Sequence, residues 1–384
     1  MRPTKTTQPL KQKRKGTVIA IAVFCLAVMM GFSALVVDLG YIHSSRDEMQ
    51  RSADAAALAA CWDLGEEFAT GTAVENVLTS VTAEASTVAN KNDVTNVGPM
   101  LTSSDVTFGY LSHNQLTNPN AIWDTSNPSI FNAVRVQIQR NASVNGQIKS
   151  FFGRAFGIHG IDAEAMATAI ILRSIVGFEP PSDGTKIDIL PIAYDLESWE
   201  AMMAGAGPDN WAWDPETKQC VYGSSDNYRE INLYPQSTGA PGNRGMVDMG
   251  GANNSTNDIA RQIVEGISAD DMTAIGKPLT FENGSFTLNG DTGISAGVKD
   301  ELASIVGQTR IIPIFSEVNG PGNNAQFTIV RFCGVRILAC KLTGPRSQKH
   351  VTCQPAPVFS KGIVPGTAIT GQSDFVYSRA FLVH

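Results

Sequence analysis

Histidine is scarce in this chain, and the patterns that usually bind metal ions are missing. The five histidines stand at positions 43, 113, 159, 350 and 384, so no two of them have the spacing of a zinc-binding pair on a helix. The six cysteines include no Cys-x-x-Cys pair. The sequence therefore predicts no metal site and no metal cofactor.

Acidic residues outnumber basic residues outside the N-terminal tail. The formal net charge is −7, yet six cations and no acid precede the first apolar run, and removing those six positive charges leaves −13 for the rest. Phosphate backbones repel such an acidic body, so nucleic acid is not an expected partner. The six cations are Arg2, Lys5, Lys11, Lys13, Arg14 and Lys15.

Residues 16–37 contain no charged side chain at all. These 22 residues would form a helix of about 33 Å, enough to cross a hydrocarbon core of about 30 Å. The length favours a retained transmembrane helix over a signal peptide, whose apolar core usually has about 7–15 residues. By the positive-inside rule, the basic tail 1–15 predicts a cytoplasmic N-terminus and an exported body.

Beyond the apolar run the sequence stays typical of a helix, and residues 38–92 are expected to form a helical stalk. Alanine is the strongest helix former, and Ala53, Ala56 and Ala60 recur at spacings of three and four, which places them on one face. Small side chains allow another helix or a sheet to approach this face closely. This face either packs against a partner protein or packs against the chain's own folded domain, and the sequence favours neither.

The apolar period then changes from that of a helix to that of a strand. Within residues 93–176, "DVTFGYL", "NAVRVQIQR" and "IDAEAMATAIIL" predict a small antiparallel sheet covered by the preceding helices. Pro180 and Pro181 mark a boundary, after which residues 177–384 mix helical and strand patterns. The expected fold class is α+β: one transmembrane helix, a helical stalk, and a mixed exported region with antiparallel strands.

Five cysteines lie beyond the apolar run, in the part expected to be exported, where disulfides persist. Cys333, Cys340 and Cys353 cluster in the sequence, and a bridge between two of them is expected. An odd number leaves at least one thiol unpaired within the chain. The sequence does not determine which cysteines pair.

The surroundings of the apolar run carry a family resemblance. Gly16 opens the run, "VVDLGY" closes it at residues 36–41, and "QRSADAAALAA" follows at residues 50–60. In these features the chain resembles the N-terminal region of TadE/TadG-like proteins, assembly components of the Flp, or tight-adherence, pilus. A weaker similarity reaches about residue 175. The resemblance implies a single-pass protein of the bacterial inner membrane whose exported domain binds pilus or envelope proteins.

Two departures from the wider group narrow this expectation. Type IV prepilins generally have Glu at the fifth position of the mature chain, where counting from Gly16 gives Ile21, so trimming as a pilin is not expected. Some TadG-like chains carry a von Willebrand A domain, whose Asp-x-Ser-x-Ser metal pattern is absent here.

Asp38 is interpreted as the point where the helix leaves lipid for its partner. The residues expected to serve in anchoring and stalk packing are Gly16, Asp38, Gly40, Tyr41, Ala53, Ala56 and Ala60.

Two short matches to enzyme motifs have simpler explanations. "GISAG" at residues 293–297 fits a nucleophile elbow with Ser295 as nucleophile, but no strand runs directly into it and only His350 and His384 follow as bases. "GPGNNA" at residues 320–325 resembles a dinucleotide-binding turn, but a strand pattern follows it where a helix is needed. A helix start and a hairpin loop account for them, so neither an enzyme nor a bound cofactor is expected.

The favoured hypothesis is a non-enzymatic, membrane-anchored component of Flp pilus assembly that acts through helix packing and ectodomain binding. The alternative is a membrane-anchored adhesin or ligand-binding module unrelated to pili. A serine hydrolase that uses Ser295 is the third hypothesis.

Overall fold

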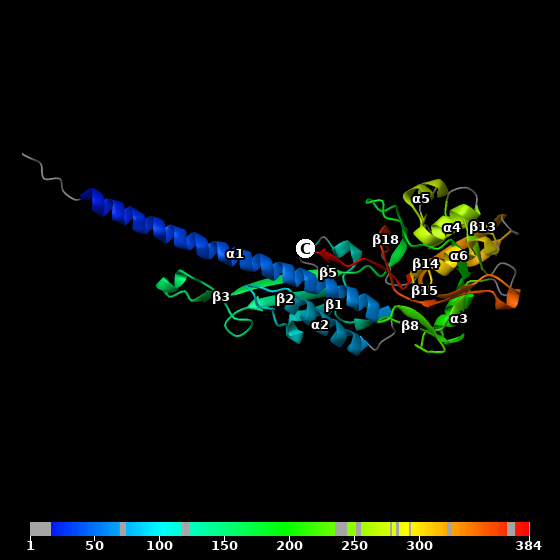
Figure 1. Cartoon of the computed structure of the whole chain (residues 1–384), viewed down its shortest axis with the longest axis horizontal. Helices are drawn as coiled ribbons and strands as arrows, with labels where there is room; N and C mark the ends of the chain where they lie inside the picture. Colours follow the sequence, from blue (N-terminus) through cyan, green and yellow to red (C-terminus); the bar gives the residue numbers. More distant parts are fainter. Residues whose placement is uncertain are drawn as a thin grey trace, which may run out of the picture.

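A long helix dominates the computed structural model of the chain (Figure 1). The structure describes residues 17–69, 74–116, 118, 123–234, 244–250, 255–276, 279–281, 284–291, 293–320, 324–366 and 373–383. The basic tail and Gly16 lie outside these residues. Helix α1 (Thr17–Ala69) is continuous over 53 residues, contains no proline, and projects from the folded body by its N-terminal half.

The two halves of α1 have different surroundings. Residues 18–37 are almost entirely exposed, including large apolar side chains such as Val18, Phe24 and Phe32. From Asp38 onward one face is buried, with Ile42 and Met49 among its residues. The helix is long and apolar enough to cross a membrane. This confirms the single apolar helix that the sequence predicts.

An N-terminal domain is built on the second half of α1. Helix α2 (Val74–Lys91) runs back along α1, and both cover a four-stranded antiparallel sheet (Figure 1). The core between them contains Leu64 of α1, Val81 of α2 and Ile138 of the sheet, all fully buried. The sheet order is β1 (Val106–Gly109), β2 (Ala133–Arg140), β5 (Ala163–Ile170) and β21 (Phe381–Val383). Residues 38–69 of α1 and 74–91 of α2 thus pack together and against the sheet.

Strand β21 comes from the opposite end of the chain. Its Phe381, Leu382 and Val383 pair with Ile170, Ala169 and Thr168 of β5. The C-terminal residues therefore complete the N-terminal sheet, and the sequence boundary near residue 176 does not separate two independent units. A strand of three residues has too little local pattern for this pairing to be recognised from sequence.

The rest of the chain forms a strand-rich body beyond the C-terminal end of α1. Five strands close into a ring, because each pairs with the next and β14 pairs with β15. Only the β7–β14 pair in this ring is parallel. The ring strands are β7 (Ile192–Asp195), β11 (Arg244–Val247), β13 (Phe286–Asp291), β14 (Thr309–Asn319) and β15 (Ala325–Lys341).

Smaller elements surround this ring. Strands β10 (Ile231–Asn232), β16 (His350–Pro355) and β19 (Ser373–Asp374) extend the same sheet. Separate small sheets are formed by β3 (Ile148–Lys149) with β4 (Gly160–Ile161), β8 (Trp211–Asp214) with β9 (Gln219–Tyr222), β17 (Val358–Ser360) with β20 (Val376–Ser378), and β12 (Leu279–Thr280) with β6 (Ile175–Phe178) and β18 (Ile363–Pro365). The helices are α3 (Leu196–Met203), α4 (Thr256–Glu265), α5 (Ala269–Ile275) and α6 (Lys299–Ser304). This mixture confirms the α+β class.

Candidate functional site

Asp38 is held at the point where α1 changes from exposed to buried. Its carboxylate accepts a hydrogen bond from Ser150 Oγ at 2.6 Å and from the backbone N–H groups of Phe151 and Gly153 at 2.8 Å each. The Phe152 N–H lies 3.1 and 3.2 Å from its two oxygens. A single carboxylate on α1 therefore binds three consecutive backbone amides of the segment between β3 and β4.

These contacts stabilise the charged form of Asp38. The hydrogen bond from Ser150, followed by those from the three backbone amides, lowers the pKa of Asp38 to about 2, although burial acts in the opposite direction. Ser150 Oγ in turn accepts the Gly153 N–H at 2.9 Å. A Cβ at Gly153 would collide with Ser150 Oγ, so this close arrangement requires glycine.

The expectation for Asp38 is thus changed in one respect. The residue does lie where the apolar segment ends, but the group it contacts belongs to its own chain. Sequence reasoning missed Ser150 and Gly153, which are 112 and 115 residues away. The polar Ser and Gly flanking two phenylalanines indicate a turn, but nothing in the sequence connects that turn to Asp38.

Tyr41 and Gly40 differ in their surroundings. The Tyr41 ring lies edge-on to Phe151, with 4.9 Å between ring centroids, so it supports the same contact one turn after Asp38. Gly40 is exposed, and a Cβ added there would find no atom within 4 Å. The structure therefore does not support Gly40 as a close-packing residue within this chain, because it points away from the sheet.

The three alanines of the expected packing face are fully buried inside the chain. Ala53, Ala56 and Ala60 have no exposed surface and belong to the core between α1, α2 and the sheet. In this structure the face packs against the chain's own domain, one of the two interpretations that the sequence leaves open. Since the face is buried, it is not open to a partner protein. Its small side chains let α1 approach its own β5 and β2 closely.

The cysteines that cluster in sequence do not form the expected bridge. No disulfide joins Cys333, Cys340 and Cys353. Strand register explains this: Cys353 lies opposite Ile337, Cys340 opposite Val351, and Cys333 opposite Ile312 of β14. Burial is the largest cause that raises the pKa of the Cys333 thiol well above its usual value and that of the Cys340 thiol to about 11.

The enzyme-like motifs have structural roles. Ser295 is exposed and caps the short 3₁₀ helix Ala296–Val298 by accepting the Gly297 N–H at 3.1 Å. His350 Nδ1 lies 3.1 Å from the Gln348 carbonyl oxygen, and His384 lies outside the described residues. Strands β14 and β15 pair on both sides of the "GPGNNA" segment, with Asn319 opposite Gln326, so it connects two antiparallel strands as expected.

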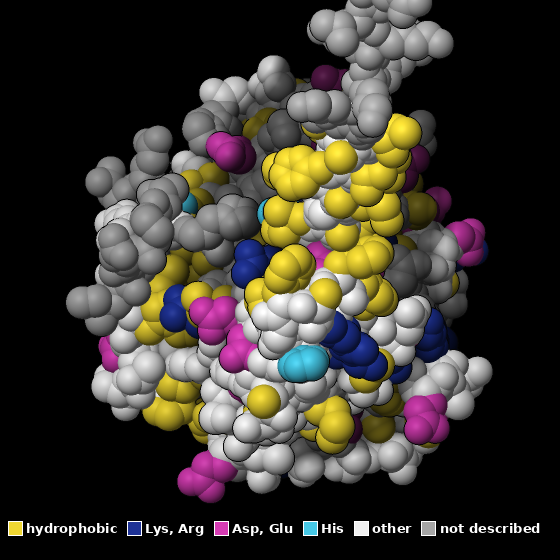
Figure 2. All heavy atoms as spheres, turned by 90° about the vertical axis from the view of Figure 1, so that its left-hand side faces the viewer, with side chains coloured by type: hydrophobic (Ala, Val, Ile, Leu, Met, Phe, Trp, Pro, Cys, Tyr) yellow, Lys and Arg dark blue, Asp and Glu magenta, His cyan; other side chains and the backbone are white. Residues whose placement is uncertain are grey.

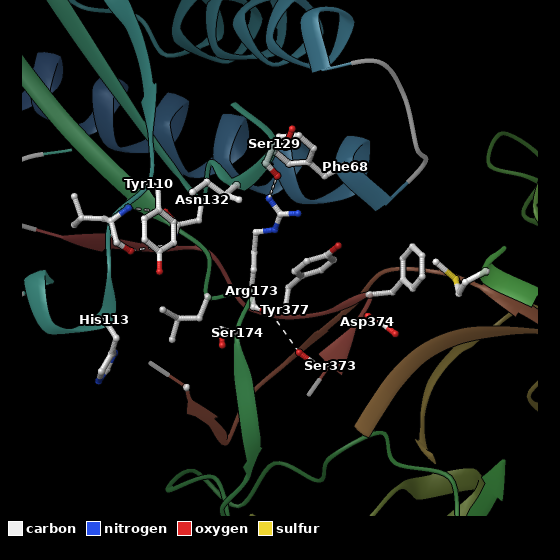
Figure 3. Close-up of a pocket in the computed structure, with 16 residues that line it drawn as sticks. Phe68, Tyr110, His113, Ser129, Asn132, Arg173, Ser174, Ser373, Asp374 and Tyr377 are labelled. Atoms are coloured by element: carbon white, nitrogen blue, oxygen red, sulfur yellow. Dashed lines mark hydrogen bonds between the residues drawn. The ribbon is translucent and has the colours of Figure 1, made fainter. Parts of the chain in front are cut away.

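A cavity of about 380 Å³ lies where the N-terminal domain meets the C-terminal body (Figure 3). Arg173 donates to the Ser129 and Phe131 carbonyl oxygens at 3.0 and 3.1 Å, and its guanidinium carbon lies 4.6 Å from the Phe68 ring centroid. Asp374 pairs with Arg331 at 2.9 Å. These polar contacts lie on the two sides of the junction: Arg173 binds groups of the N-terminal domain, and the Asp374–Arg331 pair lies within the C-terminal body.

The same cavity does not assemble a catalytic triad from its labelled side chains. His113 lies at one end of the cavity and Asp374 at the other in Figure 3. The Asp374 carboxylate also accepts the Trp199 Nε1–H at 2.9 Å, which together with the ion pair to Arg331 fixes it away from the histidine. The arrangement favours a structural role for the cavity walls.

Comparison with protein families identifies the N-terminal region. Residues 16–73 match the family described as "Putative Flp pilus-assembly TadE/G-like", and residues 48–169 match the family described as "Putative Tad-like Flp pilus-assembly". No significant match was found among curated proteins or solved structures. The matched residues comprise α1, α2, β1, β2 and all of β5 except Ile170. They confirm the resemblance read from the sequence. Both families support a role in pilus assembly.

Proposed function

Since the N-terminal region is Tad-like, we propose that this chain is a non-enzymatic, single-pass membrane component of Flp-type pilus assembly. Residues 18–37 hold it in the bacterial inner membrane, the basic tail stays in the cytoplasm, and the folded domains lie outside. The main support is the abrupt change along α1, from about 20 exposed, mostly apolar residues to a face that is buried against a sheet.

The proposed action is mechanical. Helix α1 passes from the anchor into the N-terminal domain without a proline or a break. Its second half is fixed by fully buried side chains such as Met49, Ala56 and Leu64, and Asp38 fixes the β3–β4 segment to its side. A displacement of the exported body is therefore transmitted to the anchor as a rigid movement, and the body presents its outer surface to pilus or envelope proteins.

The location is tested by fractionation and protease treatment of cells that carry the tagged full chain. The chain is expected in the membrane fraction after alkaline washing, with the C-terminal body cleaved in spheroplasts but protected in intact cells. A body that stays protected in spheroplasts would overturn the orientation. Recovery of the chain in the soluble fraction would overturn the anchor.

The pilus role is tested by deleting the chain in a strain that assembles Flp pili. Loss of pili, restored by the full chain, is expected, together with co-purification of pilus-assembly proteins. Normal pili with reduced attachment to surfaces would instead favour the alternative of an anchored adhesin. The two readouts therefore separate the two binding functions that the sequence leaves open.

A further inference from the structure

The segment between β3 and β4 exposes more apolar surface than a soluble loop normally does. Residues 150–159, named here the β3–β4 tip, expose Phe156 by 85%, Phe151 by 56%, Ile158 by 51% and Phe152 by 48%. Four large apolar side chains within eight residues form a patch of the kind that marks an interaction site. Packing within the chain does not account for this patch, although Phe151 also touches Tyr41.

The position of the β3–β4 tip is set by the Asp38 contacts. Asp38 directly follows the apolar segment 18–37 and binds Ser150 and the next three backbone amides at 2.6 to 3.2 Å. In Figure 1 the β3–β4 hairpin reaches farther toward the N-terminal half of α1 than the other strands do. The exposed phenylalanines are therefore held at the level where α1 leaves the membrane in the proposed function.

Two cations, Lys149 and Arg154, and two carboxylates, Asp38 and Asp162, lie around the patch. Lys149, Arg154 and His159 are exposed on the same hairpin. The carboxylate that faces it from α1, Asp38, is already satisfied by hydrogen bonds, and Asp162 after β4 accepts a bond from Gln147 at 2.7 Å. Figure 2 shows apolar side chains along the projecting helix and Lys or Arg side chains on both sides of it.

We propose that the β3–β4 tip is a second membrane contact, inserted among the headgroups and upper acyl chains of an anionic leaflet beside α1. Aromatic side chains concentrate at the membrane–water interface, and cations next to them bind acidic headgroups. The inference rests on the proposed function, because it needs residues 18–37 to span the bilayer. Lipid is favoured over a protein partner because the Asp38 contacts hold the patch beside the end of the exposed apolar segment 18–37.

A second contact changes what the anchor does. One helix alone leaves the body free to rotate about the helix axis and to tilt with it. The β3–β4 tip adds a contact to one side of that axis, and Asp38 keeps the two contacts together. The body is thereby held in a defined orientation toward the membrane surface.

The test places a tryptophan at three positions of the full chain in nanodiscs of phosphatidylglycerol and phosphatidylcholine. Phe156→Trp reports on the β3–β4 tip, and Phe24→Trp reports on the anchor. Tyr222→Trp is the matched control, since Tyr222 is also an exposed aromatic residue (71%) but lies on the distal body. The five native tryptophans are common to all variants, so each site is read as a difference from the parent. Lipids with brominated acyl chains quench tryptophans that touch them.

The proposal expects Phe24→Trp and Phe156→Trp to lose emission in brominated lipid and Tyr222→Trp to keep it. Quenching at Phe24→Trp without quenching at Phe156→Trp overturns the second contact and leaves the anchor intact. Absence of quenching at both sites overturns the anchor itself. An unquenched Phe156→Trp whose emission shifts to the blue at high protein concentration also overturns the lipid contact and indicates a second copy of the chain.

Asp38→Asn tests separately whether Asp38 positions the β3–β4 tip. Phe156→Trp combined with Asp38→Asn is expected to be quenched less than Phe156→Trp alone, because the segment is no longer held beside α1, while quenching at Phe24→Trp is unchanged. Equal quenching with and without Asp38→Asn would show that Asp38 does not position the tip.

Discussion

The buried alanine face of α1 leads to a quantitative prediction for Ala56→Glu. Ala56 is fully buried in the core between α1, α2 and the sheet. A glutamate there must either lose its water without a cation to pair with or force α1 away from the sheet. An unpaired buried charge costs about 3–5 kcal/mol, and overpacking alone costs about 1–3 kcal/mol. Ala56→Glu is therefore expected to lower the free energy of unfolding by about 3–5 kcal/mol.

That loss is a large part of the stability of an ordinary domain, which is about 5–15 kcal/mol. For a domain of this size each kcal/mol shifts the melting temperature by about 2–4 °C, so a decrease of roughly 10 °C is expected. The measurement is thermal unfolding of the full chain in detergent, followed by circular dichroism at the helix band. Any loss of binding partners in this variant would then follow from unfolding of the domain.

Ala55→Glu is the matched control. Ala55 is the neighbouring residue of the same type on the same helix but is only half-buried, and Arg51 precedes it by four residues on the helix. Its change in stability is expected to stay within about 0.5 kcal/mol. An Ala56→Glu chain that melts like the parent but no longer co-purifies with pilus proteins would refute the reasoning, because the alanine face would then have to be open to a partner.

Four further predictions concern two acids, the thiols and the C-terminal strand. The pKa of Asp38 is about 2, so its stabilising contribution is present above about pH 4 and is lost as the pH falls toward 2. Asp38→Asn should therefore speed amide hydrogen exchange at residues 151–153, while exchange in β2 stays unchanged. Burial, and then nearby glutamates, raise the pKa of Asp63 to about 6. The free energy of unfolding should therefore decrease by about 1 kcal/mol, after solvent screening, between about pH 4 and 6. Asp63→Asn should remove that decrease when stability is measured by urea unfolding. A pH profile that is unchanged in Asp63→Asn would contradict this prediction. Mass spectrometry after alkylation in denaturant without reductant should find modified thiols at positions 333, 340 and 353, and a disulfide-linked peptide would contradict the strand register. Truncation after Ser378 removes β21 and should cause association on size exclusion through the exposed β5 edge, whereas a monomeric product would show that the edge is protected in another way.

The sequence was sufficient for features that depend on local pattern. The charge-free run, the basic tail and the alanine-rich continuation predict one long helix, because helix formation and transfer into lipid are decided by consecutive residues. The alternation in "NAVRVQIQR" predicts a strand with one buried face, and β2 has its alternate residues Val134, Val136 and Ile138 fully buried. The Tad-like resemblance rests on the same contiguous segment.

Only the tertiary structure decided which surfaces meet. The alanine stripe is equally compatible with a partner and with the chain's own sheet, and the packing of α1 on β2 and β5 selects the second. Cys333, Cys340 and Cys353 are close in sequence, but strand register keeps them apart. The sequence by itself determined that a membrane-length helix leads into an α+β body, since those are properties of neighbouring residues. The contact of Asp38 with Ser150 and the closure of the N-terminal sheet by β21 join residues more than a hundred positions apart, and such contacts exist only once the whole chain has folded.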